Sequence, residues 1–398
     1  MKIAIVAGHF MPSIGYQEVY LARAYSRLGH TVQVITSCLA SPSAQNIKMD
    51  RFVPGEFPSF DNDYTILRLP SLFAFRSNVL PIGLNRAIDV FRPDIIMVVG
   101  VGKLFPYRVF NKSFHNKYSI VTLLGNNTDM STWGKVTWKT IIVQKWLKGW
   151  IYALAVKWSS RIVLYTPSTL EIIEYLIPKQ QYRKLHQKMK ISSLGFDPKV
   201  FYFDNSTRDD MRKSLGISSD DLVFITVTRL TPRKQIEVFI DAVVAAQEKF
   251  KDISIYYLII GGLNDSYEKS LKLKVKQSKC KARVIIRPFS DHNLTRAYYC
   301  AADIGLWFNA AITIQESMGT GLYVVLKNKL TVNHLILPNK NGYLYEGSVL
   351  VGLMTLLENR LEEILDVSKR EKRIEINSSL LSYERIAEDM ISGLIKIS

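Results

Sequence analysis

The sequence predicts an α/β protein made of two doubly wound domains, each with a parallel sheet. The chain has 398 residues, which is too long for one ordinary hydrophobic core and suits two domains of roughly 150–200 residues. Short apolar runs alternate with amphipathic helical patterns along most of the chain, which is typical of repeated strand–helix–strand units. A content of 47% hydrophobic and 22% charged residues is that of a globular protein.

The first series of elements opens with a strand over 2–8, an amphipathic helix over 18–30 and a second strand over 31–36. The helix closes at Gly29, and glycine is common there because it tolerates left-handed backbone. Apolar runs predict three further strands, over 94–100, 118–124 and 161–166.

A polar segment, YFDNSTRDDMRKSLG over 202–216, then interrupts the alternation. We interpret it as an interdomain linker that leads into a helix, and we place the first domain at 1–203 and the second at 204–380. The last residues, 381–398, have apolar side chains at helical spacing and predict a terminal helix that must pack against a domain.

The second series begins with a strand over 221–230 and a long helix over 234–250. Four more apolar runs predict strands over 253–262, 282–289, 303–308 and 322–327. In doubly wound sheets the ligand lies outside the carboxyl ends of the strands, so we expect the functional residues in the loops that follow these runs.

Two cations follow the first strand of the second series. Arg229 stands at the end of the strand and Lys234 at the start of the next helix. Together with the positive end of the helix dipole they predict a binding site for an anion. The alternative is that both are ordinary solvated surface residues.

Glu316 is the only acidic residue between Asp303 and Glu346. It follows the strand over 303–308 and falls in the first turn of a helix that we expect to start near Thr313. One interpretation is a capping box, because Thr313 and Glu316 have T-x-x-E spacing. The other is a carboxylate that accepts hydrogen bonds from a pair of sugar hydroxyls of a bound nucleotide.

Gly15 lies in the loop between the first strand and its helix, where glycine lets the backbone approach a ligand. The GxGxxG spacing of a dinucleotide fingerprint is absent, so a tight turn without a ligand explains this glycine equally well.

The formal charge of +17 calls for a partner such as nucleic acid, anionic lipid or a phosphorylated small molecule. No acidic residue stands between Asp129 and Glu171, and the segment 133–161 within that interval combines lysines with tryptophans. Its members are Trp133, Lys135, Trp138, Lys139, Lys145, Trp146, Lys148, Trp150, Lys157, Trp158 and Arg161. This composition suits an anionic membrane surface. Core packing of the tryptophans is the alternative, and nucleic acid is disfavoured because no nucleic-acid-binding module accompanies the segment.

Three widely spaced cysteines form neither a disulfide framework nor a metal-ligand pattern, which favours a reducing cytoplasm. The first apolar run is too short for a signal peptide, and no run reaches the ~18–20 apolar residues of a spanning helix. The histidines are scattered and no DxD pair stands in a suitable loop, so we predict a metal-independent protein with no cofactor.

Five segments, in this order, resemble the retaining glycosyltransferases of family 4, which have the GT-B fold and are also called glycosyl transferases group 1. They are PSIGYQEVYLARAYSRLGHTVQVIT, ISSLGFDPKVF, VTRL with Lys234, ADIGLWF…IQESMGTGLYVV and the closing SYERIA. The resemblance spans nearly the whole chain.

The resemblance implies two Rossmann-like domains facing across a cleft, with a UDP- or GDP-linked sugar held mainly by the second. Residues matching Arg229 and Lys234 would bind the donor diphosphate, and Glu316 would grip the ribose hydroxyls. The loop 309–313 would present backbone N–H groups to the donor, and the terminal helix would cross back onto the first domain. We count Gly15, Phe289, Thr313 and Ile314 with these donor-binding residues.

The sequence departs from the family pattern at two places. Phe308 occupies a position where the family commonly has a second glutamate. The family's histidine after the fourth strand of the first domain is replaced within LLGNNTD, where Asn126, Asn127 or Asp129 would have to serve. We take Asn126 as the candidate, beside Arg229 and Lys234, for a catalytic role.

The resemblance and the basic segment together predict a retaining hexosyltransferase that moves a sugar to a lipid-linked saccharide. It would work in bacterial surface polysaccharide assembly, such as that of O-antigen or capsule, as a cytoplasmic protein on the inner face of the membrane. The alternatives are a nucleotide-sugar epimerase of the same architecture and a non-catalytic nucleotide- or lipid-binding relative. The donor sugar, the linkage and the oligomeric state are left open.

Overall fold

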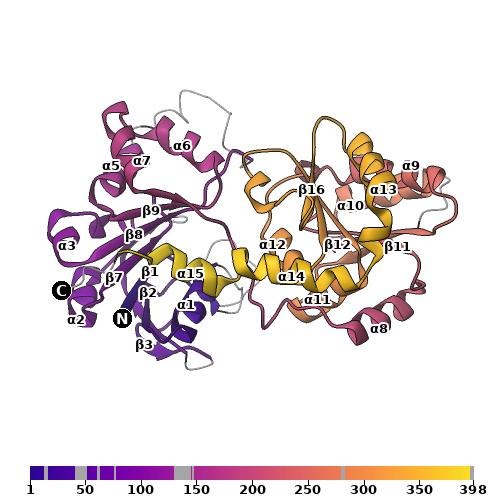
Figure 1. Cartoon of the computed structure of the whole chain (residues 1–398). Helices are drawn as coiled ribbons and strands as arrows, with labels where there is room; N and C mark the ends of the chain where they lie inside the picture. The colour runs from indigo at the N-terminus through magenta and orange to yellow at the C-terminus, as the bar shows by residue number, and fades with distance from the viewer. Residues whose placement is uncertain are drawn as a thin grey trace. The chain divides into compact units, whose positions relative to one another are not determined.

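The computed structural model describes residues 1–12, 17–40, 52–60, 63–75, 78–129, 145, 148–278 and 283–394. The chain forms two compact units, drawn in Figure 1. Unit 1 contains Met1–Leu194 and Tyr383–Ser398, and unit 2 contains Gly195–Ser382. The sequence pattern suggested boundaries at 203/204 and 380/381. Both units are α/β with largely parallel sheets, so the predicted fold class is confirmed.

The main sheet of unit 1 has the strand order β10-β9-β8-β7-β1-β2-β4-β3. Neighbouring strands are parallel except β3 and β4, and β5 and β6 form a separate antiparallel hairpin. The strands are β1 (Lys2–Ala7), β2 (Thr31–Ser37), β3 (Gly55–Pro58), β4 (Thr65–Leu69), β5 (Ser71–Phe75), β6 (Asn78–Pro81), β7 (Ile95–Val99), β8 (Ser119–Leu124), β9 (Arg161–Leu164) and β10 (Met189–Ile191).

Helices cover both faces of this sheet, because its central strands are apolar on both sides and must bury both. One apolar core lies beneath α2, α3, α5, α6 and α7, and the other beneath α1 and α15 (Figure 1). The helices are α1 (Gln17–Arg27), α2 (Leu84–Phe91), α3 (Lys112–Lys117), α5 (Gly149–Trp158), α6 (Ser168–Leu176), α7 (Tyr182–Lys188) and α15 (Tyr383–Ile391), with short 3-10 turns η2 (Tyr107–Val109) and η4 (Lys179–Gln181).

The terminal helix α15 packs against α1 within unit 1. The rings of Tyr20 and Tyr383 stack with centroids 5.0 Å apart. The Tyr25 hydroxyl donates a hydrogen bond to the Ala387 carbonyl at 3.1 Å. The apolar spacing that predicted this helix therefore buries Ile386, Ala387 and Met390 in the core of unit 1.

The sheet of unit 2 is fully parallel, with the order β13-β12-β11-β14-β15-β16. Its strands are β11 (Leu222–Val227), β12 (Ile255–Gly262), β13 (Arg283–Pro288), β14 (Ile304–Trp307), β15 (Tyr323–Lys327) and β16 (Gly342–Tyr345). Its helices are α8 (Asn205–Leu215), α9 (Ile236–Lys249), α10 (Ser266–Gln277), α11 (His292–Ala301), α12 (Ile312–Gly319), α13 (Val349–Leu365) and α14 (Ser368–Leu381), with 3-10 turns η5 (Pro232–Lys234) and η6 (Asn333–Leu335). All strands predicted from the sequence are present in both units.

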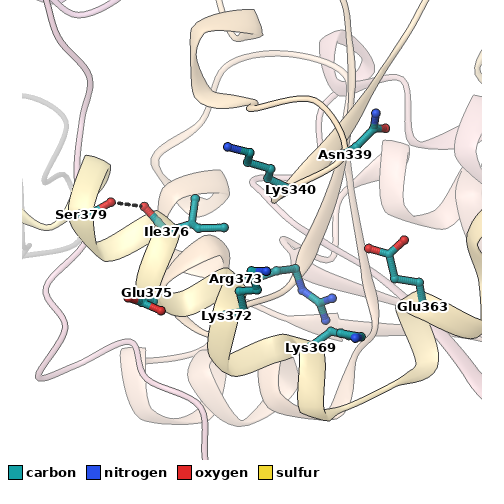
Figure 2. Close-up of a pocket in the computed structure, with 9 residues that line it drawn as sticks. All are labelled: Asn339, Lys340, Glu363, Lys369, Lys372, Arg373, Glu375, Ile376 and Ser379. Carbon is teal, nitrogen blue, oxygen red and sulfur yellow. Dashed lines mark hydrogen bonds between the residues drawn. The ribbon is translucent and has the colours of Figure 1, made fainter.

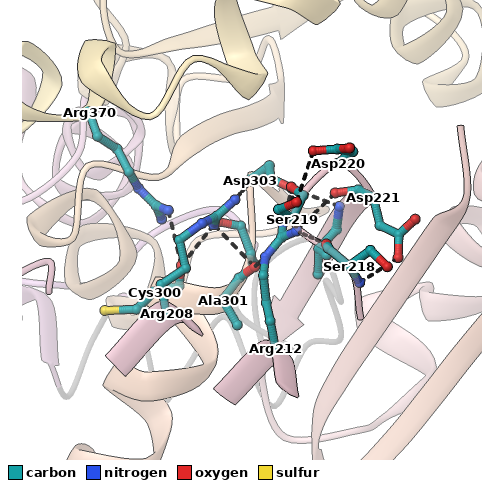
Figure 3. Close-up of polar contacts among 12 residues, drawn as sticks. Arg208, Arg212, Ser218, Ser219, Asp220, Asp221, Cys300, Ala301, Asp303 and Arg370 are labelled. Carbon is teal, nitrogen blue, oxygen red and sulfur yellow. Dashed lines mark hydrogen bonds and ion pairs between the residues drawn. The ribbon is translucent and has the colours of Figure 1, made fainter. Parts of the chain in front are cut away.

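The polar segment 202–216 is not a linker, and this prediction was wrong. Its residues form α8, which packs against α11 inside unit 2. Figure 3 shows the reason: Arg208 and Arg212 are buried and bind the two carboxylate oxygens of Asp303 at 2.7 and 2.8 Å. Their guanidinium groups also donate to carbonyl oxygens at the end of α11. The polar composition of the segment therefore did not reveal that one face of α8 is buried, because arginines with ion-pair partners can be buried.

Candidate active site

The two loops that follow β11 and β14 lie together at the carboxyl edge of the unit 2 sheet. Arg229 is exposed two residues beyond β11, and Lys234 closes the η5 turn before α9. The Lys234 ammonium donates to the Ala310 carbonyl at 3.4 Å, and the Asn309 amide donates to the Arg233 carbonyl at 2.8 Å. These contacts hold the cation-bearing loop against the loop before α12.

Helix α12 begins one residue earlier than predicted, and this removes the capping-box interpretation. The residue before the helix is Ala311, and no side chain caps it. Thr313 instead donates its hydroxyl to the Val227 carbonyl at 2.7 Å and accepts a hydrogen bond from the Trp307 indole at 3.1 Å. Thr313 therefore fastens α12 to the end of β11. Glu316 is the fifth residue of the helix and lies beyond its first turn.

Glu316 is buried, and among the described residues its carboxyl group has no hydrogen-bond or ion-pair partner. Its side chain is only 6% exposed. Burial raises the pKa of its carboxyl group from 4.5 to about 8. In the described part of the chain we find no hydrogen bond or ion pair to this carboxylate. Burial of an acid without a partner lowers the stability of the folded protein. A buried acid with a perturbed pKa at the carboxyl edge of a parallel sheet is therefore a candidate functional residue.

Two of the remaining predicted donor residues, Phe289 and Ile314, lie in unit 2. Phe289 follows β13 and is 78% exposed. The side chain of Ile314 is in the apolar core and its backbone N–H donates to the Ala311 carbonyl at 3.2 Å. Glu237, which sequence reasoning did not single out, lies in the first turn of α9 and accepts a hydrogen bond from the Tyr267 hydroxyl. Gly15 lies outside the described residues.

Phe308, where the family commonly has an acid, is covered by cations. The Lys329 ammonium lies 4.1 Å from the centre of its ring, and that of Lys327 lies 5.9 Å away. Lys329 also donates to the Phe308 carbonyl at 3.3 Å and to the Asn309 side chain at 3.1 Å. Lys329 therefore holds the loop that contains Phe308 and Asn309.

In unit 1, Asn126 lies beyond the carboxyl end of β8. Its amide donates to the Tyr152 hydroxyl at 2.8 Å, and its backbone carbonyl accepts a hydrogen bond from Thr169 at 2.6 Å. The neighbouring turn is closed by a hydrogen bond of 3.1 Å from the Asp129 N–H to the Asn127 side chain. The side chain of Asn126 is thus oriented by a buried tyrosine.

Two charged residues on the same edge of unit 1 were missed by the sequence analysis. Glu18 is buried in the first turn of α1, and burial raises the pKa of its carboxyl group to about 7, opposed by its own backbone hydrogen bond and by the charge of Lys103. Lys103 follows β7, and burial lowers the pKa of its ammonium group. The available signal was an acid directly before the apolar Val19, Tyr20 and Leu21, a run that is entirely buried.

The basic tryptophan-rich segment is described only in part. Trp133, Trp138 and Trp146 lie outside the described residues. In α5, Trp150 is 43% exposed and packs edge-on against Tyr107. Trp158 packs on the core of unit 1 with the Lys157 ammonium 4.8 Å from its ring centre. Within the described residues no helix is long and apolar enough to cross a bilayer. The same residues contain no group of three potential metal ligands.

Part of the chain matches a known protein family. Residues 207–379, most of unit 2, match the family model described as Glycosyl transferases group 1. The resemblance predicted from the sequence is thereby confirmed for these residues. No curated protein sequence matches the chain.

Three solved structures illustrate the fold. Anabaena HepE in complex with UDP shares 15% identity with a TM-score of 0.67, covering 99% of both chains. It was also crystallised with UDP-glucose. Sucrose-phosphate synthase from Thermosynechococcus elongatus shares 15% identity with a TM-score of 0.65, covering 98% of this chain and 97% of its own. WaaG, a glycosyltransferase involved in lipopolysaccharide biosynthesis, shares 15% identity with a TM-score of 0.55, covering 98% of this chain and all of its own. The chain thus has the predicted GT-B fold.

Proposed function

We propose that this chain is a retaining glycosyltransferase that moves a sugar from a nucleotide-sugar to a lipid-linked saccharide. One observation carries the proposal. At the carboxyl edge of unit 2, two cations lie on the loop after β11, and a buried carboxyl group without a described partner lies on α12, whose preceding loop is bound to the first one. These loops fall within the segment that matches the group 1 glycosyl transferases.

The donor would be bound through groups of opposite charge. Arg229 and Lys234 suit a diphosphate, because charged donors bind phosphate oxygens through strong hydrogen bonds. The Glu316 carboxylate suits two ribose hydroxyls, because in the ionised form both of its oxygens act only as acceptors. The exposed ring of Phe289 offers a face on which a base can stack. The complexes of HepE with UDP and UDP-glucose favour a uridine nucleotide as the donor.

The chemistry rests on the leaving group. The bond between the anomeric carbon and the phosphate oxygen breaks, and the acceptor oxygen bonds to the same face of that carbon. The proton of the acceptor hydroxyl passes to an oxygen of the departing diphosphate. Arg229, Lys234 and the start of α12 stabilise the negative charge that develops on this diphosphate. We propose that no metal ion takes part, and that Asn126 orients a hydroxyl of the substrate.

The acceptor is inferred from the segment 133–161. In its described part, Trp150 is exposed and Lys157 lies over Trp158, an arrangement of apolar rings and cations suited to anionic lipid. WaaG, which shares the fold, is involved in lipopolysaccharide biosynthesis. We therefore propose that the protein works on the inner face of a bacterial membrane, in surface polysaccharide assembly.

One assay tests this function. Purified protein is offered UDP- and GDP-linked sugars with and without membrane lipid extract, and free nucleotide is measured. Release that requires the extract, survives EDTA and is lost in Glu316→Ala supports the proposal. Isomerisation of the sugar without extract would identify an epimerase. Nucleotide-sugar binding without turnover under any condition would identify a non-catalytic relative.

A further inference from the structure

A basic pocket of about 690 Å³ lies in unit 2 (Figure 2). Three segments form it: the loop before β16, the end of α13 and one side of α14 from Lys369 to Ser379. Its charged and polar lining includes Asn339, Lys340, Glu363, Lys369, Lys372 and Arg373.

This basic pocket is separate from the candidate donor edge. The strands β11, β14, β15 and β16 are parallel, so their carboxyl ends share one edge of the sheet. Arg229 and Thr313 follow carboxyl ends, whereas Lys340 stands just before the amino end of β16. Arg373 donates its Nε–H to the carbonyl of Gly321, just before the amino end of β15, at 2.8 Å. The pocket therefore lies at the opposite edge of the sheet.

Arg373 is the residue that makes this pocket a candidate site. It is only 4% exposed, yet it lines the cavity. Its Nε–H is bound to Gly321, and its guanidinium carbon lies 5.9 Å from the ring centre of Tyr323. Its two terminal nitrogens have no hydrogen-bond partner in the described residues, and Figure 2 shows them directed into the space between Lys369 and Glu363. A buried guanidinium with two free nitrogens is suited to bidentate binding of an oxyanion.

The charges around Arg373 favour an anion. Four cations line the pocket against two carboxylates, those of Glu363 and Glu375. Glu363 accepts a hydrogen bond of 2.8 Å from Arg360, and its charge also attracts the Arg373 guanidinium, so it offsets part of the positive charge of the pocket. The lysines at positions 340, 369 and 372 are exposed, so their flexible side chains can close over a ligand.

We propose that the basic pocket binds a phosphate ester, with the phosphate on Arg373 and the lysines around it. A cavity of this size is in the range of about 300–1,000 Å³ typical of small-molecule sites and is larger than inorganic phosphate requires. The ester is therefore a phosphorylated metabolite or the headgroup of an anionic lipid. The inference does not depend on the proposed glycosyltransferase activity, because it involves none of the residues of the donor edge.

The test uses glycerol 3-phosphate as a soluble phosphate ester and isothermal titration calorimetry with the full chain. The double variant Lys340→Ala/Lys369→Ala removes two exposed cations of the pocket and is expected to weaken binding at least tenfold. The matched control, Lys269→Ala/Lys276→Ala, removes two exposed lysines of α10 and is expected to bind as the wild type does. Arg229→Ala/Lys234→Ala, which alters only the donor edge, should also leave binding of this probe unchanged.

A second arm uses phosphatidylcholine vesicles with and without phosphatidic acid, and measures co-sedimentation. Binding of glycerol 3-phosphate that depends on Lys340 and Lys369 identifies a soluble ester. Binding to phosphatidic acid alone, with the same dependence, identifies a lipid headgroup. Arg373→Lys keeps the charge but loses the two free nitrogens, and should weaken binding while thermal unfolding shows that the chain still folds. Binding to neither probe, or binding that the lysine pair does not alter, would overturn the inference. If the wild-type protein does not bind UDP, this result would contradict the proposed function but not the inference about the basic pocket.

Discussion

Replacing Glu316 by glutamine should stabilise the empty protein and weaken its binding of nucleotide. The carboxyl pKa is raised from 4.5 to about 8 because the group is buried. The folded protein therefore binds one more proton than the unfolded chain between these two pH values. Ionisation of Glu316 then lowers the free energy of unfolding progressively as pH rises from about 4.5 to about 8. A glutamine at this position carries no such cost.

The size of the effect follows from the shift. At pH 7, which is about 2.5 units above the unfolded pKa of 4.5 and still below the folded value, the effect is about 3.5 kcal/mol as an upper bound, at about 1.4 kcal/mol per unit. Below pH 4.5 both side chains are neutral, and the two proteins should have nearly equal stability. The stability difference should therefore grow with pH, which distinguishes it from a packing effect.

The assay is urea unfolding of wild type and Glu316→Gln at several values between pH 4.5 and pH 8. Glu268→Gln is the matched control, because Glu268 is also buried in unit 2 but its pKa is lowered by a hydrogen bond to Lys272. Glu268 stabilises the fold above its unfolded pKa, and its replacement should destabilise the protein at pH 7.

In parallel, UDP affinity should fall about tenfold or more in Glu316→Gln, because a hydrogen bond to a charged acceptor is lost. A variant that is less stable than the wild type at pH 8, or that binds UDP normally, would refute the reasoning.

Three further changes test other parts of the structure. Asp303→Ala leaves the buried guanidinium groups of Arg208 and Arg212 without their carboxylate and should cost about 3–5 kcal/mol in urea unfolding, whereas Asp220→Ala on the exposed turn should cost little. Thr313→Val removes the hydroxyl bound to the Val227 carbonyl, and should cost about 1–3 kcal/mol of stability and also weaken UDP binding, because α12 is no longer fastened to β11. Phe308→Glu places an acid beside Lys327 and Lys329; it should leave UDP affinity within about threefold but change the preference among UDP-sugars, and an unchanged preference would show that this position does not face the sugar.

The repeating part of the fold could be predicted from the sequence. Buried parallel strands are continuous apolar runs, and each predicted run from KIAIVA to LYVVLK forms a strand. Arg229, Lys234 and Glu316 could be placed near the carboxyl edge for the same reason, because the ends of the runs mark the functional loops. What held these loops together could not be predicted, since the contacts of Thr313 with Val227 and of Lys234 with Ala310 join residues far apart in the chain.

The burial of charged residues could not be predicted from the sequence. The segment with Arg208 and Arg212 has the composition of an exposed linker, yet both side chains are buried against the end of α11. Composition reports how many charges a segment has, and not whether a partner is available elsewhere in the chain. Glu18 was missed for the same reason, because its burial depends on the packing of α1 against the sheet of unit 1.

Buried charged residues with a structural role can be distinguished from candidate ligand-binding residues by their hydrogen bonds and ion pairs, and not by their burial. Arg208 and Arg212 are as buried as Arg373, but their donors reach Asp303 and the backbone carbonyls near it. In the described residues, the two terminal nitrogens of Arg373 have no hydrogen-bond partner, although the charge of Glu363 attracts them, and the Glu316 carboxyl group has neither a hydrogen bond nor an ion pair. Burial of either group in its ionised form lowers the stability of the empty protein, and for Arg373 the attraction of Glu363 offsets part of this cost. The two groups have opposite signs when ionised and lie near opposite edges of one sheet. The same physical argument underlies both proposals, a donor of hydroxyl hydrogen bonds at the carboxyl edge and a phosphate ester at the amino edge.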